Sequence, residues 1–363
     1  MRTIKLKIEE ILVLIYLTLY CLKYYTNLNM EVTTAAIAGY GFVCFCYLYQ
    51  RHKELRGFLN LLLLLGAFSA IASRVNGNKV LIYVFLQLSL ECLGVLLYVC
   101  RERLRRIRGY SKFLFGVLCV LMVLAYWSRE KNQGIYISDS LSSNSFSVFA
   151  LFFIAILVLD CLWNHRRYPY ASIVAALLLA VLAEGMGGVI TIALLLLGLL
   201  LKSRNNTLSI GKMIFFLGMA FVALFLLGQG LEHLLSIALD DNGRFAIWKY
   251  YLELAFGNIQ NMLFGANISG NGTLMFYKNM HNTFLNYHYF FGSAVLLFFV
   301  ILIAIQEYKF IKEKKFVLFL ILNILALRSL TDAAELYSAI WIFMFLSECR
   351  SRDTEKTHEE LAV

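Results

Sequence analysis

Apolar runs of roughly 15–22 residues, separated by short polar breaks, constrain this chain more than any other feature. A run of that length forms a helix long enough to cross a hydrocarbon core of about 30 Å at 1.5 Å per residue. The composition agrees, because 60% of the 363 residues are hydrophobic and only 15% are charged, against about 25% charged in soluble domains. The sequence therefore predicts an all-α, multi-spanning integral membrane protein.

Polar breaks divide the chain into about twelve expected spans. We expect spans at 8–28, 33–49, 57–73, 79–100, 111–127, 146–163, 170–184, 187–202, 211–229, 289–306, 316–330 and 335–347. The basic N-terminus resembles a signal peptide, but its apolar run is long and no small-residue cleavage site follows, so we expect an uncleaved first span. The weakest boundary lies near Gly185, where a glycine-rich turn predicts a tight outward hairpin, with a partly re-entrant pair as the alternative.

The basic residues predict the orientation of the chain in the membrane. Most of the Lys and Arg residues fall in alternate loops, which favours a cytoplasmic N-terminus and C-terminus. The net charge of +10 then faces the anionic inner leaflet, and no nucleic-acid partner is needed to explain it. We expect one polytopic membrane domain over 1–363, ending in a short cytoplasmic tail at 348–363.

The eight cysteines lie in or beside the expected spans without a Cys-x-x-Cys pair. That placement argues against both a disulfide framework and a zinc site.

Two outer segments are long enough to carry a site. Residues 128–145 are predicted to form a plain solvated loop. Residues 230–288 combine aromatic, glycine and polar residues, and within them Arg244–Phe256 is predicted to form an interfacial helix. Its expected apolar face is Phe245, Trp248, Leu252 and Phe256. We therefore expect the functional site in this large outer loop, which precedes the last three spans.

The large loop resembles the signature region of the O-antigen polymerase and O-antigen ligase superfamily, the Wzy-like bacterial polysaccharide polymerases. Members of this family show an Arg followed by a Trp, then a Leu-Phe-Gly turn, then a His-Asn pair with a Gly nine residues beyond it. The matching residues are Gly243-Arg244 with Trp248, Leu263-Phe264-Gly265-Ala266-Asn267, and His281-Asn282 with Gly292. The chain departs from the family at Val295, where Gly, Thr or Tyr is frequent, and at Glu184-Gly185, where many members have Ser-Arg. Arg328 is then the alternative source of a second phosphate-binding arginine.

The resemblance implies glycosyl transfer from a polyprenyl diphosphate-linked oligosaccharide at the outer face of the bacterial cytoplasmic membrane. Such a reaction needs a group that accepts the proton of the acceptor hydroxyl, and His281 suits this because an imidazole titrates near pH 6.5. It also needs a cation for the diphosphate, and Arg244 suits this because guanidinium binds phosphate oxygens in pairs. We expect His281 and Arg244 to be catalytic, and no metal or other cofactor to be required.

Further residues have both a functional and a structural interpretation. Asn282 is a substrate ligand or the cap of the following helix, and His288 is a second base or a supporting partner of His281. Arg244 itself has a structural alternative in a turn-side ion pair. Asp241, next to Asp240, is a substrate ligand, a site for a divalent cation or a turn former.

Within the membrane, Glu91 shares one helix face with Gln87 and Tyr83. It is expected either to face a glycan or diphosphate cavity or to form interhelical hydrogen bonds. Arg328, Asp332 and Glu335 flank the last outer turn and are expected either to pair with one another or to line the site.

The expected function is an envelope polysaccharide polymerase for capsule, exopolysaccharide or O-antigen. The expected partners are the lipid-linked substrate, membrane lipids and other polysaccharide-export proteins. The alternative is a ligase that transfers a finished glycan to a different acceptor. A lipid-linked oligosaccharide flippase is disfavoured, because the two halves of the chain look unlike each other and charge within the spans is scarce.

Overall fold

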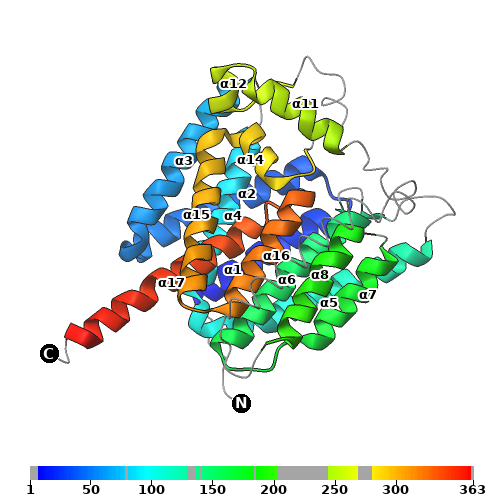
Figure 1. The fold of residues 1–363 in the computed structure, drawn as a ribbon, viewed down its shortest axis with the longest axis vertical. Coiled ribbons are helices and arrows are strands. Elements are labelled where there is room, and N and C mark those ends of the chain that lie inside the picture. Colours follow the sequence, from blue (N-terminus) through cyan, green and yellow to red (C-terminus); the bar gives the residue numbers. More distant parts are fainter. Residues whose placement is uncertain are drawn as a thin grey trace. The chain divides into compact units, whose positions relative to one another are not determined.

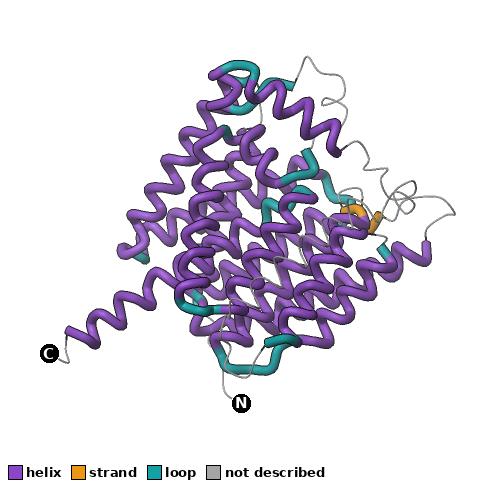
Figure 2. Tube along the Cα trace, viewed as in Figure 1, coloured by secondary structure: helices purple, strands orange, loops and turns teal. Residues whose placement is uncertain are grey.

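The computed structural model describes residues 7–77, 81–128, 136–138, 141–183, 185–202, 244–268 and 280–360. Helices form almost all of this described part (Figures 1 and 2). The α-helices are α1 (Ile8–Tyr25), α2 (Met30–Arg51), α3 (Arg56–Val75), α4 (Leu81–Val99), α5 (Leu104–Ser128), α6 (Ser143–Trp163), α7 (Tyr170–Leu182), α8 (Met186–Leu200), α11 (Arg244–Phe256), α12 (Ile259–Phe264), α14 (Thr283–Phe291), α15 (Ser293–Lys312), α16 (Phe316–Thr331) and α17 (Tyr337–Glu360). Two 3-10 turns, η1 (Lys53–Leu55) and η2 (Arg101–Arg103), precede α3 and α5, and two short strands, β1 (Tyr136–Ser138) and β2 (Leu141–Ser142), precede α6.

Among the described residues, six helices are long and apolar enough to cross a membrane. They are Met30–Arg51, Lys53–Val75, Leu81–Val99, Arg101–Ser128, Ser145–Trp163 and Ser293–Lys312. Four shorter apolar helices accompany them, at Tyr170–Leu182, Gly187–Leu200, Phe316–Thr331 and Tyr337–Cys349. The expectation of an all-α membrane protein is confirmed at this level, and the expected span 211–229 lies outside the described residues.

Glycines lie at two helix junctions near the predicted boundaries, Gly185 before α8 and Gly292 after α14. The helix over 170–202 is interrupted, since α7 ends at Leu182 and α8 begins at Met186. The expected span 289–306 needs a correction, because Gly292 has a φ of 78° and separates α14 from α15. An L-residue rarely adopts that backbone conformation, so a glycine permits the bend.

The contacts between Cα atoms divide the chain into two compact units. The first contains residues 1–64, 85–184 and 335–363, and the second contains residues 65–84 and 185–334. In the first unit, the buried Glu10 at the start of α1 binds Arg106 of α5 through an Oε2–Nη1 contact of 2.6 Å. Asp160 near the end of α6 similarly binds Arg108 of α5 at 2.9 Å. Buried carboxylates paired with arginines thus join α5 to the helices on either side of it.

The segment 128–145 is more structured than the plain loop predicted for it. Strands β1 and β2 pair antiparallel, and the buried Ser138 hydroxyl donates a hydrogen bond to the carbonyl oxygen of Tyr24 at 2.5 Å. Strand β1 is therefore anchored to the end of α1, which hydropathy along the sequence does not reveal.

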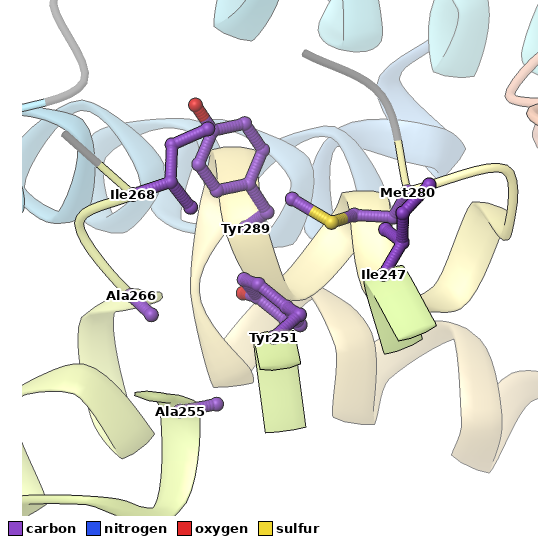
Figure 3. Packing of buried hydrophobic residues seen from close by; sticks show 7 residues of the cluster. All are labelled: Ile247, Tyr251, Ala255, Ala266, Ile268, Met280 and Tyr289. Carbon is purple, nitrogen blue, oxygen red and sulfur yellow. The ribbon is translucent and has the colours of Figure 1, made fainter. Parts of the chain in front are cut away.

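The second unit has a small core beneath α11. Ile247, Tyr251 and Ala255 point from one face of α11 towards Ala266, Ile268, Met280 and Tyr289 (Figure 3). This buried face adds to the predicted one, whose Phe245 and Phe256 are 63% and 72% exposed. Both faces of α11 are apolar. In a membrane protein, lipid is as apolar as a core, so side-chain size alone does not identify the buried face.

Candidate functional site

The end of α16 forms a polar corner that is mostly buried. Arg328 donates from Nη2 to Asp332 Oδ2 at 2.8 Å and from Nη1 to Thr331 Oγ1 at 3.0 Å. The side chains of Arg328 and Asp332 are only 3% and 8% exposed. The four-residue separation places the two groups one turn apart, where a guanidinium reaches a carboxylate. The corner thus holds a fixed carboxylate beside a fixed cation.

A glycine lets α8 approach this corner closely. A Cβ atom placed on Gly187 would lie 3.2 Å from Arg328 Nη1 and 3.5 Å from Thr331 Oγ1. Helices α8 and α16 pack side by side (Figure 1). Gly187, at the start of α8, therefore leaves room for the Arg328 guanidinium.

The segment that leads into α14 docks against the same corner. Asn282 accepts hydrogen bonds at Oδ1 from the Phe284 and Leu285 amides, so it caps α14. Its Nδ2 donates to the Leu330 carbonyl oxygen at 3.1 Å. Thr283 Oγ1 donates to the Asp332 carbonyl oxygen at 2.9 Å and accepts from the Ala334 amide at 2.8 Å.

Asn282 thus has the structural role expected of it, that of the cap of the following helix. Its amide is occupied by the cap and by α16, and this side chain helps to fix its neighbour His281 against the corner.

Arg244 reaches the corner from a third part of the chain. It is the first residue of α11, and its Nη1 donates to the Thr331 carbonyl oxygen at 3.0 Å. Its Nε is buried without a hydrogen-bond partner. Among the described residues, no carboxylate pairs with Arg244. Within the part of the chain that the structure describes, the guanidinium therefore keeps an unused donor and a positive charge with no carboxylate partner.

His281 lies between these charges. Its Nδ1 is 4.0 Å from Asp332 Oδ1, and its side chain is 30% exposed. Burial lowers the pKa of His281 below its usual value, Asp332 opposes that shift, and the positive charge of Arg244 adds to it. The imidazole is accordingly neutral at pH 7, which is the form that accepts a proton.

The backbone of His281 is strained. Its φ is 47°, a left-handed conformation that costs a non-glycine residue about 1–3 kcal/mol. Such a conformation persists only where surrounding contacts enforce it, and here the cap at Asn282 and the corner at Leu330 supply contacts on the C-terminal side.

His288, the other histidine of this region, is occupied within the protein. Its Nε2 is 2.8 Å from the Met262 carbonyl oxygen, which only accepts, so Nε2 carries the proton. Its Nδ1 then accepts from the Tyr251 hydroxyl at 2.7 Å. Burial lowers the pKa of His288, which keeps it neutral. His288 therefore ties α11 and α12 to α14.

The remaining candidates lie elsewhere or outside the described residues. Glu91 belongs to the other compact unit, where it is 2% exposed and its Oε1 accepts from Gln87 Nε2 at 3.2 Å, one turn earlier on the same helix. Its Oε2 has no hydrogen-bond partner. Asp241 and Asp240 fall outside the described residues, and within the described ranges no group of three or more His, Cys, Asp and Glu side chains is arranged to hold a metal ion.

No protein-family model, curated protein or solved structure matches this chain. Its chemistry must therefore be inferred from the corner itself. A neutral imidazole beside a carboxylate can accept a proton, and an arginine with an unused donor can hold an anion. The corner thus brings together the imidazole of His281, the carboxylate of Asp332 and the guanidinium of Arg244.

Sequence analysis named Asp332 either as a partner of Arg328 and Glu335 or as part of the site lining, and Asp332 does pair with Arg328. It missed Thr283 and Thr331. Thr283 carried no signal because its hydrogen bonds join segments about 50 residues apart, and the Thr331 carbonyl oxygen meets Arg244 across 87 residues.

Proposed function

We propose that this protein is a bacterial envelope polysaccharide polymerase, a glycosyltransferase that uses a polyprenyl diphosphate-linked glycan. One observation carries the proposal. Arg244, His281 and Arg328, which come from three distant segments, converge on the corner that contains Asp332. These are the residue types that transfer from a lipid diphosphate requires.

In the proposed reaction, a hydroxyl oxygen of the acceptor sugar attacks the anomeric carbon of the donor. The bond between that carbon and the diphosphate oxygen breaks, and polyprenyl diphosphate leaves with the bonding electron pair. The neutral His281 accepts the hydroxyl proton, and the charge of Asp332 stabilises the imidazolium that forms.

Arg244 is the better placed of the two arginines to bind the diphosphate. Its Nε has no partner and its charge is not paired within the described residues, whereas Arg328 already binds Asp332. A guanidinium beside the leaving oxygens offsets the charge that develops there. In this proposal Arg328 mainly holds the Asp332 carboxylate in place.

The proposed reaction takes place at the outer face of the cytoplasmic membrane, in a chain of about twelve spans with both termini inside. In such a chain, successive helix ends alternate between the outer and the inner face. Contacts within each unit support this assignment of the ends. Helix ends that are expected outside meet in the second unit, where the end of α16 contacts the starts of α8, α11 and α14. Helix ends that are expected inside meet in the first unit, where Glu10 contacts Arg106.

The lipid-facing side of the second unit supports the same placement. The exposed apolar side chains of α11 continue into α12, where Ile259 is 71% exposed. Asn76, just beyond the membrane helix α3, donates to the Phe264 carbonyl oxygen at the end of α12 at 2.8 Å. Helix α12 is thus attached to the end of a candidate span, the position of an interfacial segment.

The test compares His281→Ala and Arg244→Ala in the native host, with His165→Ala and Arg74→Ala as exposed controls. Each variant is first shown to be inserted in the membrane and abundant, and lipid-linked and surface glycans are then separated by size. We expect both site variants to accumulate single lipid-linked repeat units and to lose long polymer, while both controls remain normal. Full-length lipid-linked glycan that never reaches its final acceptor would instead identify a ligase, and normal polymer in both site variants would reject the site.

A further inference from the structure

The peptide groups on both sides of Met280 are held by side chains from two different helices. The Met280 carbonyl oxygen accepts from Trp248 Nε1 of α11 at 2.7 Å. Its amide donates to Asn286 Oδ1 of α14 at 3.1 Å. The Met280 side chain is buried in the core beneath α11 (Figure 3). The backbone N–H and C=O groups of Met280 are thus both hydrogen-bonded, and we call these two hydrogen bonds the Met280 clamp.

His281 follows the clamp directly and is fixed on its other side as well. Asn282 caps α14 and donates to the Leu330 carbonyl oxygen of α16. Between these fixed points His281 has its left-handed φ of 47°. If the Met280 clamp opened, the backbone of His281 would be free to relax to an ordinary conformation and its imidazole would move relative to Asp332.

We propose that Trp248 and Asn286 are positioning residues, which act through the Met280 backbone to hold the His281 imidazole against Asp332. The inference rests on the proposed function for its catalytic consequence, but the positioning itself is a property of the structure. It also gives the Arg-x-x-x-Trp spacing of α11 a physical meaning. One turn of this helix places Arg244 at the corner and Trp248 at the Met280 carbonyl.

The competing explanation is that Trp248 only fills space. Its ring contacts the core beneath α11 and lies 5.3 Å from the Phe245 ring, centroid to centroid, in an edge-to-face arrangement. Trp248→Phe retains an aromatic ring for this packing and removes the N–H donor. A packing role predicts little change at His281, whereas a positioning role predicts a local one.

The first readout is independent of activity. Purified protein in detergent is treated with diethyl pyrocarbonate, and modification of each histidine is followed over time by mass spectrometry. We expect Trp248→Phe to increase the modification rate of His281 severalfold, while His288, whose two nitrogens are both bonded, keeps its slow rate. Trp127→Phe is the matched control, because Trp127 is 78% exposed. Asn286→Leu should behave like Trp248→Phe, and Asn286→Asp should restore the slow rate because it retains an oxygen acceptor.

The second readout is polymerisation by the same preparations. We expect Trp248→Phe to lower kcat by about 10- to 100-fold with little change in KM, because substrate binding does not use the clamp. An unchanged His281 rate in Trp248→Phe would overturn the inference, and so would equal acceleration of His281 and His288, which would mean that α11 had detached. A change confined to His281, together with normal polymer from His281→Ala, would preserve the clamp and reject the proposed function.

Discussion

Breaking the ion pair between Arg328 and Asp332 should destabilise the fold far more than breaking an exposed pair. The two groups lie 2.8 Å apart with side chains only 3% and 8% exposed. We consider Arg328→Met, Asp332→Asn and the double variant, because each single change leaves one buried charge without its partner and the double change leaves none.

The expected magnitude follows from this geometry. At 2.8 Å and an effective dielectric constant near 20, the attraction between unit charges is about 6 kcal/mol, and desolvation of both groups offsets part of it. Removing one partner of such a pair typically costs about 3–5 kcal/mol. Arg328→Met should fall near the lower end, because Asp332 keeps the Ala333 amide at 2.9 Å. The double variant should cost about 3 kcal/mol less than the sum of the singles.

The assay is unfolding of purified protein with increasing SDS, followed with a thiol-reactive fluorescent dye. The cysteines suit this assay because most of them are buried and none forms a disulfide in the described residues. The control is the cycle of Arg101→Met and Glu102→Gln, whose groups lie 3.9 Å apart with side chains 24% and 82% exposed. That pair should couple by no more than about 1 kcal/mol. If the effects of the two changes at Arg328 and Asp332 add to within about 0.5 kcal/mol, the two buried charges do not stabilise each other, contrary to this prediction.

Two further predictions concern pH and backbone conformation. Because burial lowers the pKa of His281 below its usual value, polymerisation should rise with pH with a midpoint below about 6.5. Asp332 raises the pKa of His281 and Arg244 lowers it. Asp332→Asn should therefore move the midpoint to lower pH, and Arg244→Gln should move the midpoint of its residual activity to higher pH. A midpoint that neither variant shifts would contradict the role of His281. Gly265→Ala should lower the free energy of unfolding by more than about 1 kcal/mol, since Gly265 has a φ of 86° and an added Cβ would collide with carbonyl oxygens of α14. Gly39→Ala is the control, because no atom lies within 4 Å of a Cβ added at Gly39. It should be neutral or slightly stabilising in the same SDS assay. Equal effects of the two changes would mean that the backbone conformation of Gly265 does not matter for stability.

Most of the apolar helices could be predicted from the sequence to within a few residues, but α5 begins earlier, at Leu104, and α15 and α17 continue to Lys312 and Glu360. The apolar runs end near charged or glycine residues, and the break between Leu182 and Met186 includes Gly185. The second apolar face of α11, which packs against the protein, could not be predicted in this way. Ile247, Tyr251 and Ala255 repeat every four residues just as regularly as the larger exposed side chains do, and hydropathy does not separate a face against lipid from a face against protein.

For the candidate site, the sequence indicated most of the side chains but not their arrangement. His281, Arg244 and Arg328 were each named from their residue types and surroundings. The approach of His281 to the Asp332 carboxylate and the hydrogen bond from Trp248 to Met280 join residues 51 and 32 positions apart, and a single sequence carries no signal for such distant pairing. For the same reason, His288 could be distinguished from His281 only when both of its ring nitrogens were seen to be bonded.

The most direct test of the proposed function uses purified protein in liposomes with isolated polyprenyl diphosphate-linked repeat units. Polymer length and released polyprenyl diphosphate are measured together for the wild type and for His281→Ala. We predict one released diphosphate for each new glycosidic bond in the wild type, and neither product above background in the variant. Polymer formation by His281→Ala at the wild-type rate, or the absence of any bond formation by well-folded wild-type protein, would contradict the account.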